Sequence, residues 1–392
     1  MTPPSPHLFT TFHHPRCDRH ESSCDITTSF WMIQSLLSHT SQNVISQLMW
    51  WFHLPTSSSS ASIAASFISC VSRVNFSMAL YIATSHVLAI FALQVLPSCR
   101  WQTLVFTGML FYTGVLGVTA GAHRLWAHKS YKAHGLVRVV LMLWQSTSLQ
   151  GSIFDWSRWH RLHHKFAETD LDPHNIHRGL FYAHMGWLVM RPTSRMVAAV
   201  AAVPCDDLLQ DWVVAMQHRF HWVLNPIMCF AMPVAVSSFL WREDWTTALL
   251  VAGFLRQVLV MHATCVANSV THIVGSKPYN AVLSARDSLW VALVSLGEGY
   301  QNWHHQFPQD YAAAEDECPW QFNATKAFID GCAMAGLAGH RQRALHLWGQ
   351  KKYVLRSRLL DELRPFRTCN PSSTSSTSSH VGTRLSSETM KN

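Results

Sequence analysis

The chain has 392 residues, of which 48% are hydrophobic and only 13% are charged. Soluble globular domains carry about 25% charged residues, so this composition argues against a soluble enzyme and favours a membrane protein. Its 17 tryptophans suit the lipid–water interface. The net charge of +8 lies beside apolar segments, which favours anionic lipid head groups or an acidic partner protein over nucleic acid.

The two ends of the chain differ from its middle. Residues 1–75 are rich in Ser, Thr and His and include the serine run Ser57–Ser60, so we expect a poorly structured extension. Residues 351–392 read as a basic and then Ser/Thr-rich tail. Residues 76–350 are expected to form one membrane domain.

Four apolar stretches have about the 20-residue length that crosses a bilayer. They lie at about 77–97, 103–121, 222–240 and 246–267. Short connections within each pair predict two helical hairpins. A bend is expected at Pro226 and Pro233, and Arg256 inside the fourth stretch should face protein or a water-filled cavity.

Positive charge sets the expected orientation. Eleven Lys and Arg lie between the second and third stretches, whereas the hairpin tips carry only Arg100 and Arg242. This asymmetry places the long connection and both termini in the cytosol. We therefore expect an all-α fold, with four transmembrane helices in two hairpins and a cytosolic helical cap domain.

Three histidine clusters lie on the segments expected in the cytosol. They are His123 and His128 after the second stretch, then His160, His163 and His164, then Gln301-Asn302-Trp303-His304-His305 after the fourth stretch. Residues three or four apart share one helix face, so the middle cluster can direct all its rings into one cavity. The five-residue spacing of the first cluster fits a helix end or an irregular turn.

The number of histidines indicates more than one metal ion. Imidazole binds Fe, Zn and Cu, but zinc is satisfied by three or four ligands, and these clusters offer at least seven. Two metals in an all-histidine cage fit that count better. Isolated histidines are more simply explained as surface or hydrogen-bonded core residues, namely His134, His177, His218, His221 and His262.

Longer motifs surround the clusters. They are Thr119-Ala-Gly-Ala-His-Arg-Leu-Trp-Ala-His-Lys-Ser-Tyr-Lys132, Asp155-Trp-Ser-Arg-Trp-His-Arg-Leu-His-His-Lys165, Asp172-Pro-His-Asn175, Gly297-Glu-Gly-Tyr-Gln-Asn-Trp-His-His305, Phe307-Pro308 and Asp310-Tyr311. Over about residues 77–340 the chain thereby resembles the membrane acyl-CoA desaturases of the stearoyl-CoA Δ9 type. The resemblance implies a di-iron site with two Fe²⁺ ions.

The resemblance also implies the ligand set. Asn268-Ser-Val-Thr-His272 is similar to a family segment in which the histidine binds metal and the asparagine reaches it through water. The implied ligands are eight histidines: His123, His128, His160, His163, His164, His272, His304 and His305. Gln301 stands where the family has a ninth histidine, and its oxygen is a weaker ligand, so we expect an active enzyme with altered iron coordination.

Substrate contacts follow from the same resemblance. Arg158 and Arg191 match positions that contact the CoA phosphates, although both could equally be interface anchors. Gln150 and Trp156 match positions that line the acyl tunnel. Trp159, Pro192 and Cys265 depart from the usual family residues, an aspartate, a lysine and a tryptophan, which affects head-group recognition and chain length.

The implied activity is O₂-dependent desaturation of a long saturated acyl-CoA, at Δ9 by resemblance, with a cis double bond and two waters as products. No side-chain acid or base is required beyond the metal ligands. Electrons would come from cytochrome b5 and its reductase, on the endoplasmic reticulum membrane rather than a plastid membrane.

Three other functions fit the same sequence. A front-end or sphingolipid desaturase and a membrane fatty-acyl hydroxylase would share the scaffold. A non-enzymatic metal-binding membrane protein, such as a transporter, is the alternative from another class. A transporter would place polar residues through its spans, whereas these histidines gather beyond the span ends, which favours catalysis.

Overall fold

The computed structural model describes residues 71–315 and 321–352. Nearly all of the expected N-terminal extension and C-terminal tail therefore lies outside the described residues. Within the described ranges the chain is mostly helical, as predicted. Two short strands, β1 (Lys132–Ala133) and β2 (Ala338–Gly339), pair antiparallel.

Four continuous helical stretches are long and apolar enough to cross a membrane, so the chain is a multi-pass membrane protein. They span Phe76–Ser98, Trp101–Ala127, Trp212–Trp241 and Trp245–His272. The first two consist of α3 (Phe76–Val95), η1 (Leu96–Ser98), α4 (Trp101–Leu116) and η2 (Gly117–Ala127). The last two consist of α10 (Trp212–Pro226), η5 (Ile227–Ala231), α11 (Met232–Trp241), α12 (Trp245–Ala248), η6 (Leu249–Leu255), α13 (Arg256–Ser269) and η7 (Val270–His272).

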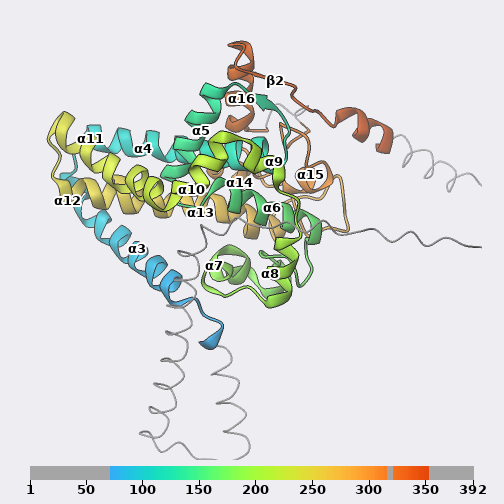
Figure 1. Cartoon of the computed structure of the whole chain (residues 1–392), viewed down its shortest axis with the longest axis horizontal. Coiled ribbons are helices and arrows are strands. Elements are labelled where there is room, and N and C mark those ends of the chain that lie inside the picture. The colour runs from blue at the N-terminus through green and yellow to red at the C-terminus, as the bar shows by residue number, and fades with distance from the viewer. Residues whose placement is uncertain (1–70, 316–320, 353–392) are drawn as a thin grey trace, which may run out of the picture.

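Shorter elements fill the connections. Between the second and third stretches lie α5 (Gly135–Thr147), α6 (Ile153–Phe166), η3 (Ile176–Arg178), η4 (Tyr182–Gly186), α7 (Trp187–Val189), α8 (Ser194–Ala201) and α9 (Asp206–Gln210). After the fourth come α14 (Leu289–Val294), α15 (Gln301–Gln306) and α16 (Ala324–Met334). In Figure 1 the long helices α4, α10, α11 and α13 lie together, and α6, α15 and α16 gather toward one end of them.

The first stretch packs on the fourth. Helix α3 contacts η6 most extensively, while α4 contacts α13 and α5. Gly117 at the start of η2 allows the second stretch to approach α5 closely, because a Cβ there would lie 2.2 Å from the Gln145 backbone nitrogen. The two-hairpin arrangement and the cytosolic cap remain predictions.

Arg256 faces protein, as its place in the fourth stretch predicted. The side chain is fully buried and donates to the backbone carbonyls of Ala252, Thr147 and Cys229. The three carbonyls belong to η6, α5 and η5, so this one guanidinium on α13 joins three other segments. Placing its hydrogen bonds within protein removes the cost of exposing the charge to lipid.

The third stretch begins at Trp212, ten residues before the predicted 222. Its first turns carry polar side chains, so a prediction from continuous apolar sequence does not include them. Gln217 is fully buried, accepts from the Ile153 backbone and donates to Gln145 and Asn225. This polar cluster fixes the loop before α6. The π-helical η5 begins directly after Pro226, the last residue of α10, so the helix continues there without the proline donor. The bend expected at Pro226 and Pro233 remains a prediction.

Candidate metal centre

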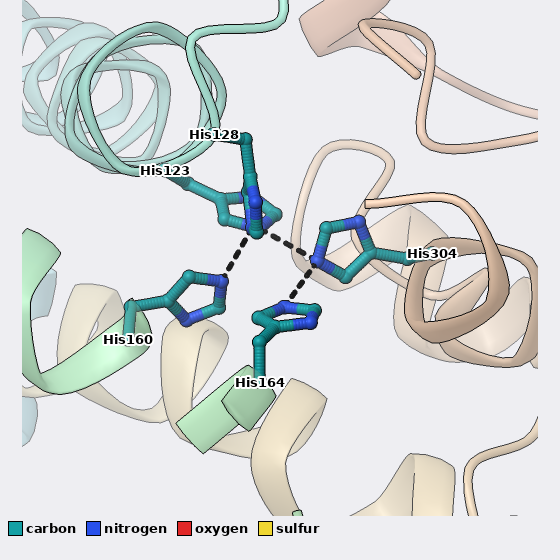
Figure 2. A group of neighbouring side chains, drawn as sticks. All are labelled: His123, His128, His160, His164 and His304. Carbon is teal, nitrogen blue, oxygen red and sulfur yellow. Dashed lines mark hydrogen bonds between the residues drawn. The ribbon is translucent and has the colours of Figure 1, made fainter. Parts of the chain in front are cut away.

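Five histidines form a first group. Their metal-binding nitrogens all lie within 4.8 Å of one another, and Figure 2 shows the rings turned toward a common centre. The members are His123, His128, His160, His164 and His304. The Nε2 atoms lie 2.8 Å apart between His128 and His160, 2.9 Å between His164 and His304, and 3.0 Å between His123 and His304.

The local structure of η2 explains the five-residue spacing of the first cluster. This segment is a π-helix, and the His128 backbone nitrogen donates to the His123 carbonyl at 3.1 Å. An i to i+5 hydrogen bond brings residues five apart onto one face. The irregular turn predicted for this cluster is therefore a widened helix that presents both rings together.

Helix α6 supplies the middle cluster. Its N-terminus is capped by Ser152, whose hydroxyl accepts from the Asp155 backbone nitrogen. Its last two turns carry His160, His163 and His164 at helical spacing. His160 and His164 belong to the first group, whereas His163 reaches a second one.

The second group is smaller. Nε2 of His163 lies 3.4 Å from Nε2 of His305, and the His305 and His272 ring centres are 5.9 Å apart. Helix α15 serves both groups, because its neighbours His304 and His305 point into different ones. All eight histidines predicted as ligands thus gather in this one region.

Hydrogen-bonding partners stand behind three of the rings, one in the first group and two in the second. Nδ1 of His163 lies 2.7 Å from Asp172, Nδ1 of His123 lies 2.9 Å from Glu298, and Nδ1 of His272 lies 2.6 Å from the Ser284 hydroxyl. A metal-bound histidine usually donates its other ring N–H in this way, which fixes the tautomer and directs Nε2 at the metal. The donor set therefore fits a metal ion.

Burial shapes the charges of this region. It lowers the pKa of His128, His160, His164, His304 and His305, with repulsion among the rings adding to the effect. Neutral imidazoles with free lone pairs are the form that binds metal. Burial also raises the pKa of Glu298, but Arg124 and His123 more than offset it and bring the pKa to about 2.

A cavity of about 310 Å³ opens onto the histidines. Its lining includes the polar residues Asn268 and Gln301 and an apolar wall from Met78, Ile82 and Met261. The Gln301 amide nitrogen donates to the Glu298 carbonyl, so the amide oxygen is the atom that remains for a metal. An apolar cavity that ends at a cluster of metal-binding side chains suits a long hydrocarbon.

Comparison with known proteins identifies the family. The family model for fatty acid desaturases matches residues 99–321. The chain belongs to the fatty acid desaturase family. Stearoyl-CoA desaturase 2 of Mus musculus is 38% identical to this desaturase over 261 residues, which cover 67% of this chain and 72% of the mouse protein.

Two invertebrate relatives are equally similar to this desaturase. A Delta(9)-fatty-acid desaturase of Caenorhabditis elegans is 39% identical over 267 residues, covering 68% of this chain and 78% of the relative. An acyl-CoA Delta-9 desaturase of Acheta domesticus is 41% identical over 254 residues, covering 64% and 70%.

The substrate residues predicted for this desaturase divide into two pairs. Gln150 and Trp156 line the cavity and are hydrogen-bonded to each other at 3.2 Å. Arg158 and Arg191 are not among its lining residues. Arg158 instead pairs with Asp155 and lies over the Phe154 ring. Two of the departures from the family pattern, Trp159 and Cys265, also line the cavity.

Sequence reasoning missed the partners behind the rings. Asp172 and Glu298 lie inside the quoted motifs, so their presence was visible, but no spacing shows which histidine each would meet. Ser284 has no sequence signal at all. Its hydroxyl donates to Glu168, which lies 116 residues before Ser284 in the chain, so Ser284 connects His272 to a carboxylate.

Proposed function

We propose that this protein is an O₂-dependent acyl-CoA desaturase that forms a cis double bond, at Δ9, in a long saturated acyl chain. The gathering of eight imidazoles beside an apolar cavity, which three of them (His123, His160 and His163) line, supports this most directly. The acyl-CoA substrate and the Δ9 position rest on the printed names of the relatives.

Two iron ions would be held by the eight histidines, with Asn268 contributing through water and Gln301 through its amide oxygen. When bound, ferrous iron supplies the activation of O₂ that removes two hydrogens from adjacent methylenes. The reaction balances as –CH₂–CH₂– plus O₂, two electrons and two protons, giving –CH=CH– and two waters. Imidazole ligands suit iron, zinc and copper, so the metal requires direct measurement.

The protein's own residues would position the chain and exclude water. The apolar wall would hold the hydrocarbon, and the joined side chains of Gln150 and Trp156 would form a rigid surface beside the histidines. Arg158 and Arg191 would contact the CoA phosphates from outside the cavity. A guanidinium group suits phosphate oxygens because its planar N–H donors match their geometry.

The electron donor would be cytochrome b5 with its reductase, which docks as an acidic protein on a basic surface. The expected location is the endoplasmic reticulum membrane, with the site and both termini in the cytosol. Reporter tags at each terminus, combined with protease protection in microsomes, would test this orientation. Reconstitution with and without cytochrome b5 would test the donor.

Expression in a yeast strain that lacks its own Δ9 desaturase tests the function. We expect monounsaturated fatty acids to appear with the double bond at carbon nine, and purified protein to contain close to two iron ions. A His160→Ala variant that is still made and inserted should abolish the product. A hydroxylated product, a different double-bond position or a sphingolipid product would replace the proposal with the corresponding relative on this scaffold. Metal without any lipid product would indicate a non-enzymatic metal-binding protein.

A further inference from the structure

Three histidines outside the metal centre form a continuous chain of contacts. Nε2 of His86 on α3 lies 3.0 Å from Nε2 of His262 on α13, and Nδ1 of His262 lies 2.9 Å from Nε2 of His184 on η4. We name His86, His262 and His184 the histidine chain. None of the three belongs to either group of the metal centre.

Both ends of the histidine chain terminate at backbone carbonyls. Nδ1 of His86 lies 2.7 Å from the Ile82 carbonyl oxygen. Nδ1 of His184 lies 2.8 Å from the Ser269 hydroxyl, and that hydroxyl donates to the Cys265 carbonyl at 2.8 Å. A carbonyl oxygen only accepts, so each end of the chain must direct a proton outward.

Counting protons decides the state of the middle ring. Five contacts join the Ile82 carbonyl to the Cys265 carbonyl through three rings and one hydroxyl. Each contact needs one proton, whereas three neutral imidazoles and one hydroxyl carry four. Because His86 and His184 donate their single N–H outward, each turns an unprotonated nitrogen toward His262. His262 can donate to both of these nitrogens only when both of its own ring nitrogens carry a proton, as an imidazolium.

We propose that the histidine chain is a proton-binding site that takes up one excess proton at His262. The proton completes the link between α3, α13 and η4. Ile82 and Cys265, whose carbonyls end the chain, both line the cavity. The site therefore fastens α3, which supplies part of the apolar wall, to α13 on the other side of it. This inference does not depend on the metal or on the reaction at the metal centre.

The surroundings favour a proton over a metal ion. Helices α3, α13 and η4 and the elements packed against them, η1, α4, η3, α7, η6, η7 and α14, contain no Asp or Glu. Their other titratable or charged groups are Tyr81, Tyr112, His177, Arg178, Tyr182, Arg256, Cys265 and His272. A divalent ion would have no carboxylate to balance its charge, whereas a single proton shared among imidazoles adds only one charge.

The experiment uses the full chain, labelled with ¹⁵N-histidine, in lipid nanodiscs. Solid-state NMR distinguishes a ring with two N–H groups from a neutral ring. Exposed histidines also gain a second N–H as the pH falls from about 8 to 5.5, so the signal of His262 is identified by its loss in His262→Gln. We expect that signal to be kept in the matched control His221→Gln, whose ring lies outside the chain. Absence of any ring with this behaviour overturns the proposal.

A second variant covers the case in which His262→Gln does not fold. His86→Leu keeps His262 but removes the lone pair that its Nε2 proton would meet, so the doubly protonated signal should disappear. Hydrogen exchange of α3 amides should also rise about 2- to 10-fold in His86→Leu relative to the native protein at the acidic end of the range. One extra zinc ion per native chain, absent from both variants after incubation with zinc chloride, would overturn proton binding in favour of a metal site.

Discussion

The two groups of the metal centre differ in how completely they are built from imidazole. The first group has five histidines in mutual reach, held by η2, α6 and α15. The second has His163, His272 and His305 with wider spacing, and Asn268 and Gln301, which we propose complete it, line the same cavity as His163. A densely imidazole-lined position tolerates little change, whereas one completed by amide oxygens should tolerate more. The comparison therefore predicts unequal sensitivity to mutation.

The largest effect is expected for the two neighbouring histidines of α15. His304→Ala removes a ring that contacts both His123 and His164, whereas His305→Ala removes one paired with His163. We expect both to lose more than about 100-fold in activity, beyond the loss typical of a supporting partner. His304→Ala should also lose more iron, as measured by mass spectrometry. Full iron retention in His304→Ala would contradict the assignment of His304 to the first group. The control is His346→Ala, because His346 is exposed and lies outside both groups.

The next effect concerns the carboxylates behind the rings, one for each group. Glu298→Gln acts on His123, and Asp172→Asn acts on His163. Each amide weakens the acceptor behind its imidazole, so we expect a loss of about 10- to 100-fold in metal affinity or turnover. Titration of iron into the metal-free protein measures it. Unchanged affinity in both variants would show that these carboxylates only support folding.

A smaller effect is expected at Gln301, which stands where the resemblance to the family predicts a histidine. Gln301→His should bind iron at least as tightly as the native protein, and Gln301→Ala should be weaker, each within about tenfold, because an amide oxygen is a weaker ligand than imidazole. Iron content and turnover of the three proteins measure this. An inactive native protein that gains activity only with Gln301→His would refute the proposal that the native centre is functional.

The smallest effect on activity is expected from Asp287, which supports the helix shared by both groups. Its carboxylate accepts from the Asn302 and Trp303 backbone nitrogens at the start of α15, and burial raises its pKa from 3.8 to about 7. Between those values the folded state binds a proton that the unfolded state lacks, so this carboxyl lowers stability as pH rises toward 7. Above pH 7 that loss remains.

Asp287→Asn removes this dependence while keeping an oxygen acceptor at the helix start. Relative to the native protein, the variant should gain on the order of 2–3 kcal/mol of stability as the pH rises from about 5 to 8. Thermal unfolding in detergent at several pH values measures the difference between the two proteins. A difference that stays constant with pH would contradict the raised pKa.

Much of the fold followed from patterns that depend on one segment at a time. Apolar length located the four stretches, and the cost of a charge in lipid predicted that Arg256 would face protein. The start of the third helix at Trp212 was not predicted, because its first turns contain the polar residue Gln217. Burial of Gln217 is explained only by its hydrogen bonds to Gln145 and Asn225, which come from other parts of the chain or the next turns. Contacts between distant segments leave no periodic signal.

In the candidate site, too, features that depend on one segment were predicted, and contacts between separate segments were not. Dense histidine clusters were visible because their spacing is local, and His272 was added only through resemblance to a family. The pairing of His163 with Asp172 or His272 with Ser284 depends on how separate elements meet. The histidine chain is the extreme case, because His86 and His262 are 176 residues apart and each looks isolated in the sequence.

The widened turn of η2 makes the length of this segment as important as its composition. Deleting one residue between His123 and His128 would leave the pair four apart, which an ordinary α-helix also places on one face. Everything on one side of the deletion would nevertheless rotate by about 100° relative to the other. The guanidinium of Arg124, which binds Glu298 and the carbonyls of Tyr311 and Ala312, could then not keep its partners while both rings kept theirs. The five-residue spacing thus allows η2 to direct His123 and His128 to the first group while Arg124 keeps its hydrogen bonds to Glu298 and to the carbonyls of Tyr311 and Ala312.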